Sequence, residues 1–304
     1  VLPAARLWRH HGAVTTRAAA ATRQPDGRLR RLAISLYGAP PDFPVDAFCG
    51  LLAARGVGGI GITPHVVSAM AADTLAAMLA HHGLRASSLN SAGYLLHAEP
   101  AAAAAQERLD ARLFAAARAL LAPVNVIPGG LLHPAPAALG RDPEQLRQAT
   151  RRGLGALAGR AATDGIALSL EPMHPMALGL RSCINQVSAA REAVAGLPGF
   201  GLTLDLFHSH WDADVGRLLR EAPALLRVVQ VCGVVLPRDG GPPRRARLGA
   251  GEIDVAAFLR ALGSAGYRGM IEYEVFFDAM DRPAPETLID EAIAGFLSLS
   301  GNLP

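Results

Sequence analysis

The sequence contains no lysine, although it carries 29 basic residues in a chain of 304. Every basic side chain is therefore an arginine, and chemistry that needs a lysine Schiff base, with or without pyridoxal phosphate, is excluded. Cysteine is scarce as well, because Cys49, Cys183 and Cys232 lie far apart and form no CxxC pair. This usage is typical of reduced thiols, and we expect a cytoplasmic protein.

Long hydrophobic runs and concentrated charge are also missing. No stretch of 18 apolar residues free of charge and proline occurs, so a transmembrane helix is not expected. The formal net charge is only +3 and the arginines are scattered, which argues against a nucleic-acid groove or a membrane-binding patch anywhere except at the N-terminus. These absences leave a small molecule as the expected partner.

Residues 1–30 differ in composition from the rest of the chain. They are rich in alanine and arginine and contain no acidic residue before Asp26. We interpret them as an N-terminal extension that is either poorly ordered or packs on a partner, as in a homo-oligomer. A transit peptide has a similar composition and is the alternative. Residues 31–304 then form one catalytic domain.

From residue 31 onward, short apolar runs alternate with longer amphipathic segments of helical period. Eight runs predict strands, at 31–38, 56–63, 84–90, 123–130, 165–172, 200–208, 227–234 and 269–276. Eight strand-helix units in a chain of this length predict an α/β fold with a single (β/α)₈ TIM barrel. An open doubly wound sheet is the alternative, but no GxGxxG motif follows the first strand.

In such a barrel the active site lies at the C-terminal ends of the strands. Polar side chains occur there on four consecutive predicted strands: Glu171, Asp205, Gln230 and Glu274. Three converging carboxylates would repel one another unless a divalent cation lay among them. Oxygen donors favour Mn²⁺ or Mg²⁺, with Zn²⁺ or Co²⁺ as further options. The alternative is that one or more of these residues caps a helix or pairs with an arginine.

Five segments resemble the motifs of the sugar phosphate isomerase/epimerase family, the xylose isomerase-like TIM barrels related to endonuclease IV. They are LSLEPMHPM, LTLDLFHSHWDADV, VVQVCGVV, RARLGAGEID and GYRGMIEYEVF. The resemblance implies that Glu171, Asp205, Glu274 and the position of Gln230 hold one divalent metal ion. It further implies that Glu171 and Glu274 act as the acid and base.

The resemblance also assigns substrate contacts. It implies that His208 hydrogen-bonds the sugar near its reacting carbon and that Arg245 neutralises a substrate oxygen, with a solvated loop charge as the alternative for Arg245. His174 and Trp211 are expected to line the pocket, Trp211 by stacking on a sugar ring; a structural role is the alternative for His174. Glu272 is expected to point into the helical layer or toward a neighbour.

Two positions depart from the family pattern. Gln230 replaces the usual histidine, which leaves a weaker, neutral oxygen ligand. Gly233 stands where many relatives carry an aspartate, which removes a contact to a metal ligand or to the substrate.

The expected reaction is isomerisation or epimerisation of a keto sugar or related polyol by proton transfer through an enediolate.

Other functions on the same scaffold stay open to different degrees. A lyase, such as a dehydratase acting on a keto-inositol, would use the same proton-abstracting core. A catalytically silent barrel that only binds a partner is kept open by Gln230 and Gly233. Phosphodiester cleavage is disfavoured, because it needs several zinc ions with extra histidines and a basic surface stripe.

Overall fold

The computed structural model describes residues 26–130 and 142–301, so most of the expected N-terminal extension, residues 1–25, lies outside the described residues. The described part begins with a 3₁₀ turn, η1 (Gly27–Arg31), in which the Asp26 carboxylate accepts a hydrogen bond from the backbone N–H of Arg28 at 3.0 Å. The Arg28 guanidinium donates to the carbonyl of Leu297 at 3.0 Å. This contact ties the start of the described chain to its last helix.

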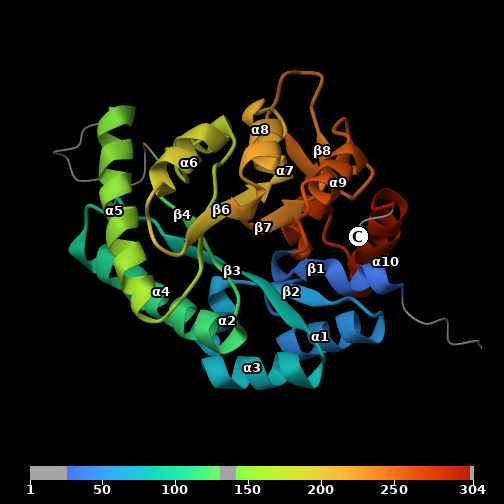
Figure 1. The fold of residues 1–304 in the computed structure, drawn as a ribbon. Coiled ribbons are helices and arrows are strands. Elements are labelled where there is room, and N and C mark those ends of the chain that lie inside the picture. The colour runs from blue at the N-terminus through green and yellow to red at the C-terminus, as the bar shows by residue number, and fades with distance from the viewer. Residues whose placement is uncertain (1–25, 131–141, 302–304) are drawn as a thin grey trace, which may run out of the picture.

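Eight parallel strands close into a barrel, which confirms the predicted TIM-barrel fold (Figure 1). The strands are β1 (Leu32–Ser35), β2 (Gly59–Ile62), β3 (Arg85–Gly93), β4 (Val124–Ile127), β5 (Leu168–Leu170), β6 (Phe200–Asp205), β7 (Leu226–Val231) and β10 (Ile271–Tyr273). β1 closes the ring because Ala33 pairs with Gly59 of β2 on one side and with Glu272 of β10 on the other. Each strand overlaps one of the eight predicted apolar runs.

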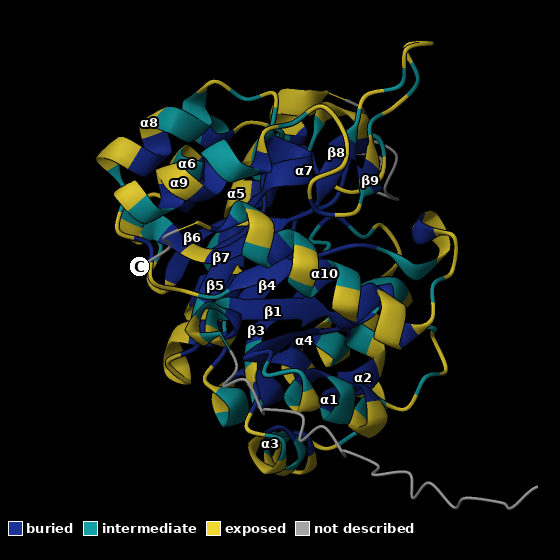
Figure 2. Cartoon of the chain, turned by 90° about the vertical axis from the view of Figure 1, so that its right-hand side faces the viewer, coloured by how far each residue is buried: buried dark blue, intermediate teal, exposed yellow. Residues whose placement is uncertain are grey.

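The helices surround the barrel and turn their exposed faces outward, while the strands inside are buried (Figure 2). They are α1 (Val45–Ala54), α2 (Pro64–Ala69), α3 (Ala72–His81), α4 (Pro100–Leu120), α5 (Pro143–Thr163), α6 (Val187–Val194), α7 (Leu206–Ser209), α8 (Asp214–Glu221), α9 (Val255–Ser264) and α10 (Pro285–Leu299). Among the described residues, none of these helices combines the length and the apolar character needed to cross a bilayer.

Local sequence explains where the long helices begin and end. α5 starts at Pro143, whose missing N–H costs nothing in the first turn, and the Asp142 side chain accepts from the N–H of Glu144 at 3.0 Å. α4 ends where Leu121 adopts a left-handed conformation, with φ 53°. The main hydrophobic core lies between these helices and the outward side chains of the strands.

The inside of the barrel is unusually polar. TIM-barrel interiors are commonly filled by branched aliphatic side chains, yet here Asn125 donates to Asn90 at 2.9 Å and accepts from Thr203 at 2.8 Å. Thr203 also donates to the hydroxyl of Ser169 at 2.8 Å. Because buried polar groups are costly unless paired, this connected network fixes the floor of any site above it.

A hairpin follows β7, where the sequence predicted one strand over 227–234 and then a loop. β8 (Gly233–Val235) and β9 (Arg244–Ala246) pair in antiparallel fashion, with Val234 opposite Arg245. A Cβ atom at Gly233 would lie 2.2 Å from the carbonyl oxygen of Arg247, closer than any real contact. An aspartate at position 233 therefore has no room, because the backbone at Arg247 lies too close to Gly233.

Candidate metal and substrate site

The four residues expected to bind a metal do meet at the C-terminal mouth of the barrel. Glu171 and Glu274 directly follow β5 and β10, Asp205 ends β6, and Gln230 lies in β7 beside Asp205. All four are buried, with exposed fractions of 5% or less. Side chains from separate strands are thus brought into one small space, as the barrel topology predicted.

Arg245 enters this space from β9 and contacts two of the carboxylates. Its guanidinium lies 2.5 Å from Asp205 Oδ2 and 2.9 Å from Glu274 Oε2, and it also donates to the carbonyl of Glu274 at 3.0 Å. The guanidinium carbon lies 4.5 Å from the ring centroid of Phe207 and 5.3 Å from that of Phe276. The alternative of a solvated loop charge is wrong, since the hairpin places Arg245 inside the site.

His208 lies on α7, just beyond the strand that sequence analysis extended to this residue. Its Nε2 atom is 3.7 Å from Glu171 Oε1 and 3.9 Å from Asp205 Oδ2, so the three residues form a compact group in which Nε2 would bind an ion only if the ring carried its proton on Nδ1. Burial lowers the pKa of His208 to about 3, which keeps the ring neutral. Because Nδ1 accepts from the backbone N–H of His174 at 3.2 Å, the proton of a neutral ring is on Nε2 and faces the carboxylates.

Gln230 offers an oxygen to the site. Its amide nitrogen donates to Glu274 Oε1 at 2.9 Å and to Glu272 Oε1 at 3.2 Å, while Oε1 is buried and has no hydrogen-bond partner among residues 26–130 and 142–301. An unpaired buried amide oxygen is costly. A hard divalent ion would supply the missing partner, and the surrounding donors are carboxylate oxygens that such ions prefer. These residues therefore fit a divalent cation.

The expected direction of the Glu272 side chain is wrong. It points into the barrel and not into the helical layer, because it lies two residues before Glu274 and side chains two apart on a strand share a face. Its Oε2 accepts from the hydroxyls of Ser87 and Ser88 at 2.7 and 2.6 Å. A Cβ atom at Gly61 would lie 2.3 Å from Glu272 Oε1, so glycine at that position makes room for the carboxylate.

The site gathers more acidic than basic groups. Among the described residues, Glu171, Asp205, Glu272 and Glu274 are buried, and Arg245 is the one buried arginine. Burial raises the pKa of Glu171 to about 7, and the charge of Asp205 acts in the same direction. Burial also holds the pKa of Glu274 well above its usual range, although Arg245 opposes it. A bound cation would relieve this excess of negative charge.

Several residues around the glutamates were missed by sequence analysis. Asn125 donates to Glu171 Oε2 at 2.6 Å, and Tyr37, Asn90 and Arg181 line the same small chamber. This inner chamber, enclosed by these residues with Glu171, His208, Arg245, Glu274 and Phe276, has a volume of about 20 Å³. An asparagine within the apolar run PVNVIPGG was the signal that could have pointed to Asn125.

His174 and Trp211 do not join this group. The His174 ring stacks on the His210 ring, with 5.6 Å between the ring centroids. Its Nδ1 atom accepts from the backbone N–H of Met176, so His174 caps the 3₁₀ turn that follows it. Trp211 donates from Nε1 to the carbonyl of His208 and lies in a separate groove beside α5 and α6. The expectation that Trp211 stacks on a sugar ring in the pocket is therefore corrected, because it lines neither chamber at the barrel mouth.

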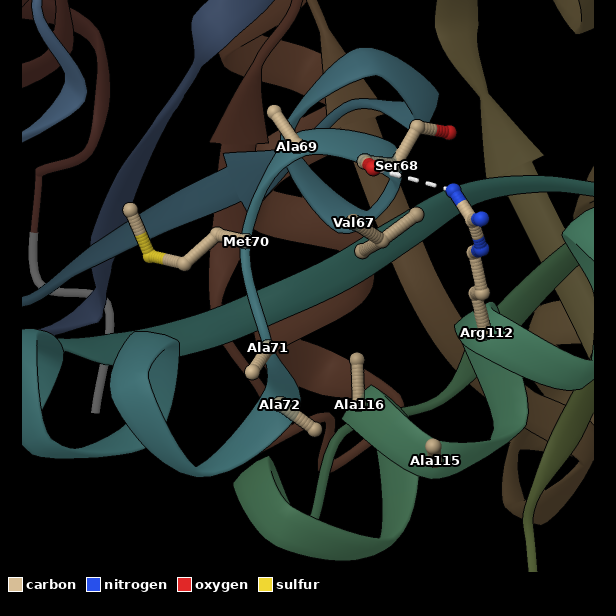
Figure 3. A pocket seen from close by; sticks show the side chains of 9 residues that line it. All are labelled: Val67, Ser68, Ala69, Met70, Ala71, Ala72, Arg112, Ala115 and Ala116. Atoms are coloured by element: carbon tan, nitrogen blue, oxygen red, sulfur yellow. Dashed lines mark hydrogen bonds between the residues drawn. The ribbon is translucent and has the colours of Figure 1, made fainter.

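Another pocket, between α2 and α4, lacks the chemistry of a reaction site (Figure 3). It has a volume of about 280 Å³, and its lining contains small or apolar side chains and Arg112, which donates to the carbonyl of Ser68 at 2.9 Å. No acid or histidine is among the residues that line it. The barrel mouth is therefore the site that the titratable residues favour.

This chain is similar to several known proteins. A family model described as xylose isomerase-like TIM barrel matches residues 49–299. A ketose 3-epimerase from Arthrobacter globiformis is 29% identical over 140 residues, which is 44% of this chain and 43% of that protein, so the match spans less than half of either.

Two solved structures share the fold. A protein from Sinorhizobium meliloti superposes with a TM-score of 0.77 and 21% identity, covering 89% of this chain and 98% of its own. The IOLI protein with a bound zinc atom superposes with a TM-score of 0.70 and 18% identity, covering 90% of this chain and 99% of its own. At these identities the structures establish the barrel architecture.

Proposed function

Because this chain belongs to the xylose isomerase-like TIM barrel family, we propose that it is a metal-dependent isomerase or epimerase of a keto sugar or related polyol. The observation that carries the proposal is that Glu171 and Glu274, from different strands, line one inner chamber and both have raised pKa values. Two carboxyl groups at different positions around a substrate can remove a proton from one face and return it at another. The ketose 3-epimerase relative supports this choice of reaction.

The residues that would hold the metal ion are Glu171, Asp205, Glu274 and the free Oε1 of Gln230. A divalent ion bound there would polarise the substrate carbonyl and the neighbouring hydroxyl, which acidifies the C–H bond between them and stabilises an enediolate. Arg245 keeps Asp205 and Glu274 in place through its two ion pairs.

Proton transfer is assigned to the glutamates and to His208. Burial raises the pKa of Glu171 to about 7 in the metal-free protein. Asn125 donates to Oε2, so Oε1 is the atom placed to accept a proton. Glu274 Oε1 is held by Gln230, so Oε2 faces Arg245 and the chamber. The Nε2–H of His208 is placed to donate to a substrate oxygen beside Glu171.

A barrel that binds a ligand without metal chemistry is the second candidate. Arg245 is the observation that favours it, because the guanidinium already gives Asp205 and Glu274 a positive partner. We still place the metal enzyme first, because Arg245 does not neutralise every buried group. Three more take no part in those two ion pairs: Glu171, Glu272 and the Gln230 oxygen.

Solvent exchange tests the proposal. We expect the Mn²⁺-loaded protein to incorporate deuterium next to the carbonyl of an accepted keto sugar in D₂O. Glu171→Gln and Glu274→Gln each keep an oxygen donor but remove the base, so exchange should fall by roughly 10²–10⁴-fold. Glu192→Gln, at a largely exposed position on α6, is the matched control and should exchange at the wild-type rate. NMR of the sugar measures both the label and the product.

Three outcomes would contradict the proposal. Isomerisation without solvent label would replace proton transfer by an internal hydride shift. Release of water from the sugar would identify a lyase. Near-native exchange in both glutamine variants would remove Glu171 and Glu274 from the acid and base roles.

A further inference from the structure

A second, larger chamber opens directly above the inner chamber. It has a volume of about 660 Å³, within the range of pockets that hold drug-sized ligands. Its walls are mainly apolar and come from the segments after β5, β6 and β10 and from the β8–β9 hairpin. They include Met176, Leu180, Phe207, Pro243, Phe276 and Ala279. We call this space the outer chamber.

The two chambers are continuous. Arg181, His208, Arg245 and Phe276 border both of them. The inner chamber is much the smaller of the two, at about 20 Å³. A substrate that reaches Glu171 and Glu274 through this opening therefore extends into the outer chamber.

The lining of the outer chamber suits a flat apolar group better than a second set of hydroxyls. Apart from His208 and the arginines 181, 244 and 245, the lining side chains are apolar or small, so a flat apolar group would bury more apolar surface there than a hydroxyl would. Met176 and Leu180 are 51% and 63% exposed, so a ligand in the outer chamber would cover apolar surface that otherwise contacts water.

The arginines and phenylalanines of the outer chamber favour an aryl group over an alkyl chain. Arg181 and Arg244 are exposed and line the outer chamber together with Phe207 and Phe276. Guanidinium groups stack on aromatic faces, and aromatic rings pack against one another with additional stabilisation beyond burial. An alkyl chain in the outer chamber would bury apolar surface but would not stack on guanidinium groups or aromatic rings.

We propose that the outer chamber is a subsite for an aryl group, and that the substrate is a keto sugar carrying an aryl substituent. This inference rests on the proposed function for the position of the sugar, which would enter the inner chamber with its carbonyl end. The aryl group lies between the segment after β5 and the β8–β9 hairpin.

Binding of unreactive sugars tests the subsite without turnover. Ligand-observed NMR titrations of the Mn²⁺-loaded protein would use phenyl, hexyl and methyl β-D-glucopyranoside, which have no carbonyl to react. We expect phenyl to bind about 10-fold more tightly than methyl, and hexyl to fall between them. Leu180→Ser should remove much of the phenyl preference. The control Leu121→Ser alters a residue that is 93% exposed after α4, before β4, and should leave the preference intact.

The outcomes that would overturn the subsite are equal binding of phenyl and methyl glucosides, hexyl binding as tightly as phenyl, or an unchanged phenyl preference in Leu180→Ser. Failure of the proposed function shows separately. A protein that exchanges no solvent deuterium with any keto sugar but prefers the phenyl glucoside has the aryl subsite without the proposed reaction.

Discussion

At the scale of single residues, Gln230 sets the character of the metal site. Its amide nitrogen donates hydrogen bonds to Glu274 and Glu272, so the unpaired Oε1 atom points away from these two acids. The site thus offers oxygen ligands alone from β5, β6, β7 and β10. Such a set favours hard ions such as Mn²⁺ and Mg²⁺ over ions that prefer imidazole.

Gln230→His should change the metal preference. An imidazole nitrogen suits Zn²⁺ and Co²⁺, so we expect affinity for these ions to rise by about 10-fold while affinity for Mg²⁺ does not. Calorimetric titration of the metal-free variant and wild type measures the difference. A lower affinity for Zn²⁺ and Co²⁺ in Gln230→His would mean that position 230 does not contact the ion.

At the scale of elements, the β8–β9 hairpin carries Arg245 into the barrel mouth and forms one wall of the outer chamber. The hairpin packs closely because Gly233 lies against the carbonyls of Arg247 and Ala250, which would be 2.2 and 2.4 Å from a Cβ atom. The same packing explains why an aspartate, expected by resemblance at position 233, has no room here.

Gly233→Asp should therefore damage the fold and not restore a family contact. We expect the free energy of unfolding to fall by at least about 2 kcal/mol, since overpacking against backbone cannot be relieved by a rotamer change. Gly155→Asp is the matched control, because no atom of the described residues would lie within 4 Å of a Cβ added at this position on α5. Chemical denaturation compares the two variants. Equal stability would show that the hairpin can yield at Gly233.

At the scale of the whole molecule, closure of the barrel concentrates acidic groups that would be far apart in an unfolded chain. A carboxyl group whose pKa is raised by folding binds its proton more tightly in the folded state. Stability from such a group is present below the unfolded pKa of about 4.3 and is lost as the pH rises toward the folded pKa, which is about 7 for Glu171. His208, with its pKa lowered to about 3, acts in the opposite direction but only below about pH 6.5.

Metal and pH should therefore act together on stability. Between pH 6.5 and 8 we expect the metal-free protein to lose stability and Mn²⁺ to restore it, because the ion binds ionised carboxylates. At about 100 times its Kd the ion should add about 2.7 kcal/mol, which thermal unfolding at both pH values can measure. Asp205→Ala should lose this stabilisation, whereas Asp239→Ala, in the loop between β8 and β9, should keep it. Stabilisation by Mn²⁺ that survives Asp205→Ala would exclude this metal site.

The sequence by itself determined the barrel and the strand ends that supply its acidic residues. Periodicity is a local property, so eight apolar runs predicted eight strands, and the fold rule that strand ends share one mouth brought Glu171, Asp205, Gln230 and Glu274 together. Burial inside the barrel could be anticipated for these positions because apolar neighbours flank each of them.

Only the tertiary structure decided which other side chains reach the acids and which do not. Arg245 lies in a segment rich in arginine and proline, and only the pairing of β8 with β9 turns its guanidinium onto Asp205. Trp211 lies six residues after Asp205 in sequence, yet the short helix α7 carries its ring to another groove. Such contacts depend on side-chain direction and on segments distant in sequence, which a one-dimensional pattern does not encode.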